Sequence, residues 1–248
     1  MRLLLTLGAL VLGTTPAVTV LPRPSFPGPA RAPGGPHRLV VVSSTRVGVG
    51  TAGGSVFAPS GTVNGLPGQI VFKTANRLFG LYGRDGSTGR YLVAWTKHGD
   101  ELYAYDFLSY ARPPRIKPGE GSLVYEQPVW AQELGGTLYV ANAHLTYAAS
   151  SYGQNAYVTA IDVKTSMRLW RSPALVANAT TFLVTPHYLL TGYGFTNEPD
   201  YLYLLDRRTG RVVDRLLLDT APEKLTWHNG TVHVRTYDRV VVVRLRGA

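Results

Sequence analysis

A hairpin signal in the C-terminal third constrains this chain more than any other feature. Residues 201–215 read Tyr-Leu-Tyr-Leu-Leu-Asp-Arg-Arg-Thr-Gly-Arg-Val-Val-Asp-Arg, so one apolar run ends at an Asp and a second begins after a Gly. Side chains alternate across a strand, which places Tyr203 on one side and Leu204 on the other. Asp206 can accept N–H groups within the turn, and Gly210 can adopt the positive φ that closes such a hairpin. Both faces of this strand are apolar, so both are expected to be covered by other parts of the protein.

A version of the same signal occurs one repeat earlier. A shift of about 44 residues aligns Tyr157 with Tyr201, Asp162 with Asp206, Thr165 with Thr209 and Arg171 with Arg215. Fainter copies end at Asp106 and begin at Gly136. A period of this length with four short strands in each unit is typical of a β-propeller blade, a small sheet that is covered by the next one.

The repeat resembles that of the PQQ-like β-propeller superfamily. Two segments carry the resemblance: residues 157–170, which read Tyr-Val-Thr-Ala-Ile-Asp-Val-Lys-Thr-Ser-Met-Arg-Leu-Trp, and residues 201–210. Both follow the family's order of a strand, an Asp, a Thr-Gly turn or its equivalent, and a second strand. Trp170 matches the family's closing Trp, and Asp214 stands at that position in the next repeat. The match extends over residues 136–245 and is faint before them.

The resemblance implies a propeller fold and an exported location, and it leaves the activity open. The family's quinone-dependent dehydrogenases are longer chains with more blades and hold calcium beside the cofactor. This chain has no adjacent Cys pair and no acidic cluster assignable to calcium. The family's outer-membrane assembly scaffolds are lipoproteins, and this chain has no Cys to acylate. No cofactor is therefore expected, and PQQ with calcium is kept only for the enzyme alternative.

The predicted strands set the number of blades. They are expected at residues 38–43, 69–73, 77–82, 91–96, 101–106, 122–126, 137–141, 156–162, 167–171, 181–185, 188–193, 201–206, 211–218, 224–228, 231–236 and 239–245. At about four strands in each blade, they predict an all-β fold, a small β-propeller of four to five four-stranded blades. The last repeat is one strand short, and residues 38–43 can supply that strand. The ring would then be closed by N- and C-terminal strands, which removes an exposed edge.

Composition narrows the chemistry. The chain has 248 residues, enough for a sizeable core, and no Cys, which excludes disulfides, thiolate metal sites and Cys nucleophiles. Its net charge of +10 is uneven, because no Asp or Glu precedes Asp85 while eight of the 25 Lys and Arg residues do. A basic N-terminal third can attract anionic polymers through charge alone, and no specific nucleic-acid partner is expected.

Three segments are expected along the chain. Residues 1–17 are interpreted as a signal peptide, because Arg2 precedes an apolar stretch that ends in a small-residue Thr-Pro-Ala sequence. Residues 18–37 contain six prolines and are expected to form a Pro-rich disordered linker. Residues 38–248 are assigned to the PQQ-like β-propeller domain. The protein is expected to be secreted or periplasmic and monomeric, without a membrane span after signal cleavage.

The best indication of a binding site is a pair of insertions. Residues 143–155 and 195–200 lengthen the connection at the same place in consecutive repeats, and equivalent insertions of a repeat protein lie on one face. Aromatic side chains on such a face can stack on sugars or on a peptide. The candidates for binding a ligand or partner are His144, Tyr147, Tyr152, Tyr193 and Phe195.

No catalytic motif accompanies these candidates. The His residues are scattered over different repeats, and no nucleophile motif or metal-ligand spacing occurs, so no catalytic or metal-binding residues are predicted. The sequence favours a non-catalytic binding or scaffolding module in the periplasm or cell envelope, with an unknown protein or glycan partner. The alternative is a quinone-cofactor or sugar-active enzyme whose channel-lining site combines a His with an acid.

Overall fold

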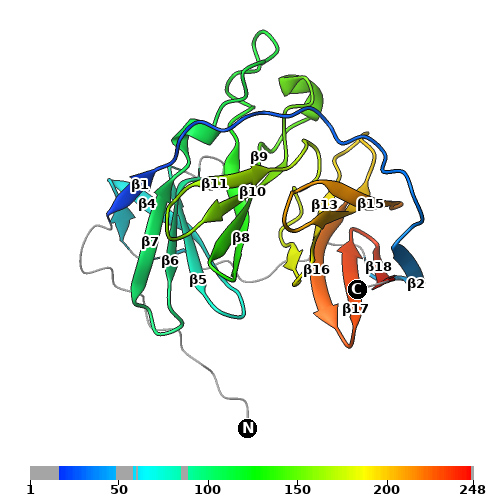
Figure 1. Cartoon of the computed structure of the whole chain (residues 1–248). Coiled ribbons are helices and arrows are strands. Elements are labelled where there is room, and N and C mark those ends of the chain that lie inside the picture. The colour runs from blue at the N-terminus through cyan, green and yellow to red at the C-terminus, as the bar shows by residue number, and fades with distance from the viewer. Residues whose placement is uncertain (1–16, 49–57, 60, 85–88, 247–248) are drawn as a thin grey trace. The chain divides into compact units, whose positions relative to one another are not determined.

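The computed structural model describes residues 17–48, 58–59, 61–84 and 89–246. The chain divides into two compact units, unit 1 with residues 1–21 and 55–108, and unit 2 with residues 22–54 and 109–248. Eighteen strands and two short 3₁₀ helices, η1 (Leu108–Tyr110) and η2 (Ala148–Ser151), form the regular structure of the described residues (Figure 1). The predicted signal peptide, residues 1–17, lies outside the described residues except for Ala17.

Unit 1 contains one sheet of six strands in the order β1-β7-β6-β5-β4-β3. Its strands are β1 (Val18–Val20), β3 (Thr62–Val63), β4 (Leu66–Lys73), β5 (Leu78–Gly83), β6 (Gly89–Trp95) and β7 (Glu101–Asp106). Strands β4 to β7 form an antiparallel meander, and β1 adds to β7 in parallel. Strand β5 is buried at every position, so this sheet has the two-sided burial expected of a blade.

Unit 2 contains three antiparallel sheets of four strands each, here called the second, third and fourth blades. The second blade has the order β11 (Arg168–Arg171), β10 (Tyr157–Asp162), β9 (Thr137–Ala143), β8 (Gln127–Leu134). The third has β12 (Leu183–Val184), β13 (Tyr188–Tyr193), β14 (Tyr201–Asp206), β15 (Val212–Leu217). The fourth has β16 (Pro222–His228), β17 (Thr231–Thr236), β18 (Arg239–Leu245), β2 (Leu39–Arg46).

One predicted strand of unit 2 is wrong. Residues 122–126 form an irregular segment, and the edge strand of the second blade is β8 instead. Glu126 ends that segment in a buried position, where its N–H donates to the carbonyl of Ala111 rather than to a strand. Pro128 made β8 hard to predict from the sequence. Proline has no backbone N–H to donate to a neighbouring strand, so it is tolerated only at the edge of a sheet or at a bulge. The register of β8 does shift at this proline.

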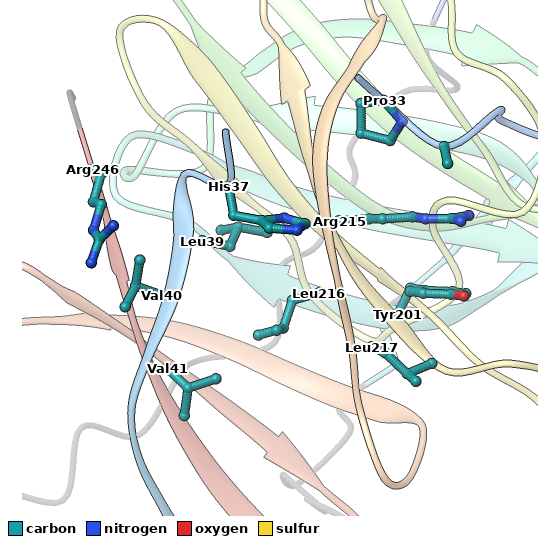
Figure 2. A pocket seen from close by; sticks show the side chains of 11 residues that line it. Pro33, His37, Leu39, Val40, Val41, Tyr201, Arg215, Leu216, Leu217 and Arg246 are labelled. Atoms are coloured by element: carbon teal, nitrogen blue, oxygen red, sulfur yellow. The ribbon is translucent and has the colours of Figure 1, made fainter. Parts of the chain in front are cut away.

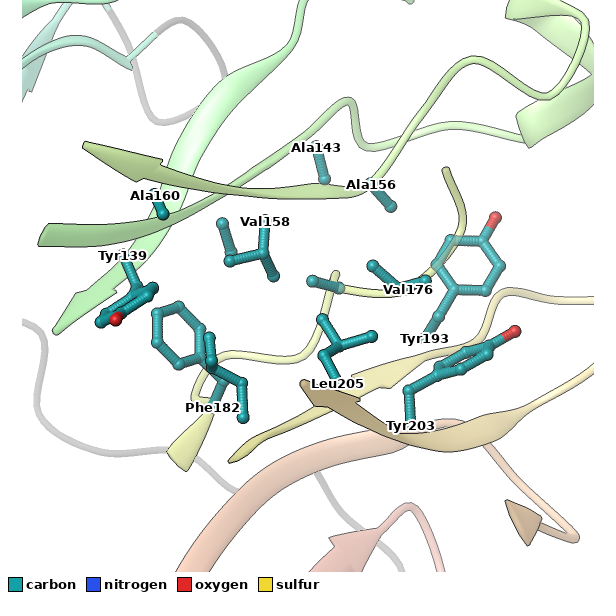
Figure 3. Close-up of a cluster of buried hydrophobic side chains, with 13 residues drawn as sticks. Tyr139, Ala143, Ala156, Val158, Ala160, Val176, Phe182, Tyr193, Tyr203 and Leu205 are labelled. Atoms are coloured by element: carbon teal, nitrogen blue, oxygen red, sulfur yellow. The ribbon is translucent and has the colours of Figure 1, made fainter. Parts of the chain in front are cut away.

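Apolar side chains that alternate along each strand hold the blades of unit 2 together. Tyr203 and Leu205 of β14 point into a cluster shared with the second blade, which contributes Val158 (Figure 3). Leu202 and Leu204 of the same strand belong to a different cluster, shared with the fourth blade. Each face of the third blade therefore covers a neighbour, as in a propeller. The fold-class prediction, an all-β chain of blade-like sheets, is confirmed.

Strand β2, which corresponds to the strand predicted at residues 38–43, completes the fourth blade, as predicted. The blue β2 lies beside the red β18 and pairs with it in antiparallel register (Figure 1). Asp214 of β15 fixes the start of β2, because its carboxylate accepts the N–H groups of Arg38 at 2.6 Å and of Leu39 at 2.7 Å. Nδ1 of His37 lies 3.0 Å from the same carboxylate. Asp214, which stands where the preceding repeat has Trp170, therefore holds the strand that closes the fourth blade.

The segment predicted as a disordered linker follows a defined course in the structure. Residues 22–37, here called the Pro-rich strap, run along the blades of unit 2 and bind mainly through carbonyl groups. The carbonyl of Gly28 accepts the N–H of Ala174 at 3.0 Å, and that of Pro27 accepts the Tyr157 hydroxyl at 3.0 Å. Proline lacks the N–H donor but keeps the acceptor, so a Pro-rich segment can bind in this way. The domain boundaries themselves stay a prediction.

Arg171 anchors this strap. Its Nη2 lies 2.7 Å from the carboxylate of Glu126, and neither side chain is exposed. The guanidinium carbon lies 4.6 Å from the ring centre of Phe26 and 3.9 Å from that of Tyr157, while Nη1 donates to the carbonyl of Ser25 at 3.2 Å. Burial raises the pKa of the Glu126 carboxyl, and the Arg171 charge opposes that rise. One cation therefore ties the strap to the second blade.

Trp170 joins the second blade to the third. Its Nε1–H donates to the carbonyl of Arg207 at 3.1 Å, and its ring packs on Gly210. A Cβ atom at Gly210 would lie 2.4 Å from the Trp170 ring, and this glycine has a φ of +70°. The turn conformation and the close approach of the ring therefore both require the Gly of the repeat signal.

We expect Gly210→Ala to destabilise the fold more than Gly230→Ala. Gly230 has a φ of +76° and no atom within 4 Å of an added Cβ, so its substitution costs only backbone strain, about 1 kcal/mol. Gly210→Ala adds overlap with a ring held by its own hydrogen bond, which costs about 1–3 kcal/mol more. Urea unfolding of both variants measures the difference, and equal losses would contradict the docking of Trp170 on this turn.

The Asp214 carboxylate predicts a pH-dependent loss of stability in acid. Burial alone would raise the pKa of Asp214, but the hydrogen bonds that it accepts outweigh burial and hold the pKa below its usual value. A lowered folded pKa contributes stability above about pH 4, and this contribution is lost as the pH falls through the folded value. Asp214→Asn should therefore cost about 1–3 kcal/mol at pH 7 and less at pH 3, measured by urea unfolding.

Asp219→Asn is the control for this prediction. Asp219 is mostly exposed, with a side chain 70% accessible and 3.3 Å from Arg239, and exposed pairs contribute little. Equal effects of the two substitutions at pH 7, or a loss at Asp214 that does not shrink in acid, would contradict the role of Asp214 at the start of β2.

Candidate functional site

The two insertions noted in the sequence lie against each other. Tyr147 of the first and Phe195 of the second form an edge-to-face pair, with ring centres 5.0 Å apart and an angle of 80° between the rings. Such a geometry is favourable for two aromatic rings. Tyr147 remains 43% exposed, so this pair both joins the insertions and presents an aromatic side chain to solvent.

Glu198 locks the contact between the insertions. One carboxylate oxygen accepts the N–H of Ala148 at 2.8 Å, and the other accepts the hydroxyl of Tyr193. Burial, and then the neighbouring carboxylate, raise the pKa of Tyr193, so this phenol stays protonated and donates. Charge-assisted hydrogen bonds of this kind are stronger than neutral ones. The sequence analysis missed Glu198, because its partner Ala148 is fifty residues away in the chain.

His144 supports the first insertion from inside. Its Nε2 lies 2.7 Å from Oγ of Ser151, and its backbone N–H donates to the side chain of Asn155 at 2.8 Å. The residue is only 2% exposed, and burial lowers its pKa to about 4. His144 therefore stays neutral at physiological pH. The structure places it as a support of the loop rather than on its surface.

A third loop joins the insertions. Tyr152, which follows η2 with a φ of 52°, is 50% exposed, and the guanidinium of Arg115 lies over its ring at 5.7 Å. The N–H of Lys117 donates to the carbonyl of Ser150 at 2.9 Å, which ties the Pro-rich loop before β8 to the first insertion. The only signal for this loop in the sequence was its proline content, which marks a break between strands but gives no partner.

A cavity of about 310 Å³ lies beside these loops. Its walls include Pro29 of the strap, Glu198 from the second insertion, and Tyr193, Tyr203 and Arg215 from strands of the third blade. Burial raises the pKa of the Tyr203 phenol, and the Arg215 charge opposes that rise. The cavity brings Tyr193 from the predicted set together with Glu198 and Arg215, which were not predicted from the sequence to bind a ligand.

A larger apolar hollow of about 620 Å³ lies farther along the strap. Figure 2 shows its walls, with Val41 of β2 on one side and Leu217 of β15 on the other. Tyr201 and Arg215 line this hollow and the smaller cavity alike, and the Arg215 guanidinium lies 4.6 Å from the Tyr201 ring centre. This cation–π pair therefore lies where the two spaces adjoin.

A metal cluster and a nucleophile paired with a His are groups from which a catalytic site can be built. In the part of the chain that the structure describes, no group of three His, Asp or Glu side chains is placed to hold a metal ion. The pair of Ser151 and His144 has hydrogen-bond geometry but is shielded from solvent. Whether the protein uses a cofactor stays a prediction.

Residues 17–48, 58–59, 61–84 and 89–246 include no helix long and apolar enough to cross a membrane.

No family model and no curated protein matches the chain. Solved structures similar to it include the computationally designed Ika8 protein, at 12% identity over 73% of this chain and 46% of that one, with a TM-score of 0.45. BamB from Moraxella catarrhalis has 12% identity over 76% and 61%, with a TM-score of 0.38. The C-terminal WD40 domain of Sif2 has 10% identity over 73% and 46%, with a TM-score of 0.45.

The chain spans about half the length of two of these structures, 46% in each case. All three likenesses are distant, with TM-scores below 0.5. The fold assignment therefore rests on the sheets, registers and core clusters described above.

Replacement of Glu198 should loosen both insertions. Glu198→Ala removes the acceptor of the Ala148 amide and of the Tyr193 hydroxyl, a loss of about 1–2 kcal/mol. Amide exchange of residues 144–155 should then become roughly tenfold faster, as measured by hydrogen exchange and mass spectrometry. Thr196→Ala, an exposed change in the same insertion, is the control. Equal exchange in both variants would contradict the locking role of Glu198.

Proposed function

We propose that the protein is an exported, non-catalytic binding module that holds a protein partner on its loop surface. The loop surface comprises the loops at residues 112–126, 143–155 and 195–200. The observation that supports this most is the tie between the insertions, made by the Tyr147–Phe195 ring pair and by Glu198. A surface built from loops that are locked to one another loses little conformational entropy when a partner binds.

The composition of the loop surface favours a protein partner over a glycan. Leu145, Tyr147 and Tyr152 are exposed, and Arg115 lies over the Tyr152 ring. Tyr and Arg are the residues that most often dominate the energy of protein interfaces. A glycan needs polar side chains with open hydrogen-bond capacity around an aromatic ring, and both oxygens of Glu198 are already engaged within the loops.

The export and the family are supported by the sequence. The basic, then apolar, then small-residue order of residues 1–17 is that of a signal peptide, which directs a chain out of the cytoplasm. Membership of the PQQ-like superfamily rests on the repeat at residues 157–170 and 201–210. Two residues of that repeat, Trp170 and Gly210, pack against each other and so join the second blade to the third. The signal peptide and the superfamily membership together support a scaffold role in the periplasm or cell envelope.

Site-specific photo-cross-linking tests this proposal. A photo-reactive phenylalanine analogue replaces Tyr147 in the full chain, expressed in the source cells, which are then irradiated and fractionated. We expect the protein outside the cytoplasm, without its first residues up to about Ala17, and joined to one protein of defined mass. The exposed ring of Tyr147 at the loop surface would lie within reach of a bound partner.

Tyr237 provides the matched control. It is 50% exposed, close to the 43% of Tyr147, and lies in the turn between β17 and β18 of the fourth blade. The same analogue at Tyr237 should give no such adduct. Adducts of equal yield at both positions, an adduct with a glycan instead of a protein, or retention in the cytoplasm would each contradict the proposal.

A further inference from the structure

We propose that the protein carries a second binding site, for an anionic sugar, in the pocket between the turns of the second and third blades. The ligand class is a sugar ring that bears a carboxylate or a phosphate. The pocket, here called the turn pocket, has a volume of about 490 Å³. That is within the range of about 300–1,000 Å³ typical of small-molecule sites.

The turn pocket lies at the opposite end of the blades from the loop surface. Its lining includes Thr137 at the start of β9, whereas the first insertion begins at Ala143, the end of the same strand. Seven residues of strand span about 20 Å. Substitutions in the turn pocket therefore test a site independent of the one proposed above.

Two arginines supply the positive charge of the turn pocket. Arg207 is held by its backbone, because its carbonyl accepts from Trp170 at 3.1 Å and its N–H donates to the carbonyl of His187 at 2.9 Å. Arg207 and Tyr139 both line the turn pocket, and the Arg207 charge opposes the rise that burial causes in the pKa of Tyr139. Arg208 follows it on the exposed side of the turn. Guanidinium groups bind carboxylates and phosphates in a fixed, often bidentate geometry.

One carboxylate also lines the turn pocket. Asp206 turns one oxygen towards its own hairpin, where Oδ1 accepts from the N–H of Thr209 at 2.8 Å and from its hydroxyl at 2.7 Å. Two guanidinium groups, Arg207 and Arg208, thus face a single carboxylate that is already hydrogen-bonded. The charges of Asp206, Arg207 and Arg208 together therefore make the lining positive.

Aromatic rings supply the second part of the recognition. Tyr139, Trp170 and Tyr188 all line the turn pocket. The first two lie with ring centres 5.9 Å apart, and the Tyr188 hydroxyl accepts from Arg38 at 2.6 Å. Aromatic side chains of this kind combine an apolar face, which suits the C–H face of a sugar, with a polar edge. Arginines beside aromatic rings match a ligand that has both a ring and an anionic group.

Calorimetric titration of the full chain tests the proposal. The probes are glucuronate, which carries the acid group of acidic polysaccharides, and glucose 6-phosphate, a free sugar phosphate. We expect at least one of them to bind with a Kd on the order of 0.1–1 mM and to raise the thermal midpoint. Glucose has the sugar ring without an anionic group, and inorganic phosphate has the anionic group without a ring. Each should therefore bind at least tenfold more weakly.

Charge-matched variants localise the binding. Arg207→Gln and Arg208→Gln should each weaken it roughly tenfold. Arg211→Gln, in the same hairpin but outside the pocket lining, should leave it unchanged. Arg208 is exposed, so its variant tests the site even if Arg207→Gln unfolds. Absence of binding by both sugars, equal affinity for glucose or phosphate, or an equal loss in all three variants would overturn the proposal.

Discussion

The structure of unit 2 depends on one constraint, which is that the central strands of the second and third blades are buried on both faces. Along β14, Tyr203 and Leu205 enter the cluster shared with the second blade, while Leu202 and Leu204 enter the cluster shared with the fourth. Each such side chain contributes about 1.5–3 kcal/mol when it is fully buried. A blade on its own would leave half of that area in water, so the blades can only be stable when stacked.

Differences between the repeats are as informative as the repeat itself. At equivalent positions, Trp170 docks the second blade on the hairpin turn of the third, whereas Asp214 receives the first N–H groups of β2. Both residues connect one blade to the structure that follows it. The first uses ring packing together with one hydrogen bond, and the second uses a buried carboxylate with several. The position that holds Trp170 in one repeat holds Asp214 in the next, where its side chain binds the start of β2.

These connections determine what lies at the two ends of the blades. At one end, the insertions after β9 and β13 meet through Tyr147, Phe195 and Glu198, and give the loop surface. At the other end, the docked turn of Arg207 and Arg208 gives the turn pocket. Stacking of consecutive blades thus brings together residues that are about one repeat apart in the chain. A binding surface assembled in this way is as rigid as the stack that carries it.

The sequence predicted the parts of the fold that have a local pattern. The strands at residues 188–193, 201–206, 231–236 and 239–245 were predicted with the bounds that the structure has, because both of their ends carry turn signals. The pairing of β2 with the last strand, β18, also followed from the count of strands in the last repeat. Strand β8 was missed, since it is an edge strand with a proline and polar side chains.

The site was predictable only in outline. The two insertions could be located by comparing repeats, but Glu198 and Arg115 acquire their roles from partners far away in the chain. The Pro-rich strap was predicted to be disordered for the same reason, because its partners Arg171 and Tyr157 lie in the second blade. His144 was singled out because it lies in the first insertion, whereas its burial depends on how that loop folds.

The central claim is that the stacked blades end in a sheet completed by β2, and a disulfide tests it most directly. Val40 of β2 and Arg244 of β18 are partners in the antiparallel register, and opposite residues have the Cα separation that a disulfide needs. The natural chain has no Cys, so within one molecule the Val40→Cys, Arg244→Cys variant can form only this bond.

We expect the Val40→Cys, Arg244→Cys variant to form this disulfide readily. The bond should raise the free energy of unfolding by about 2–4 kcal/mol. Val40→Cys with Thr226→Cys, a position on β16, which β17 and β18 separate from β2, should remain reduced. A variant that stays reduced at Val40 and Arg244, or that cross-links equally in both combinations, would contradict the account.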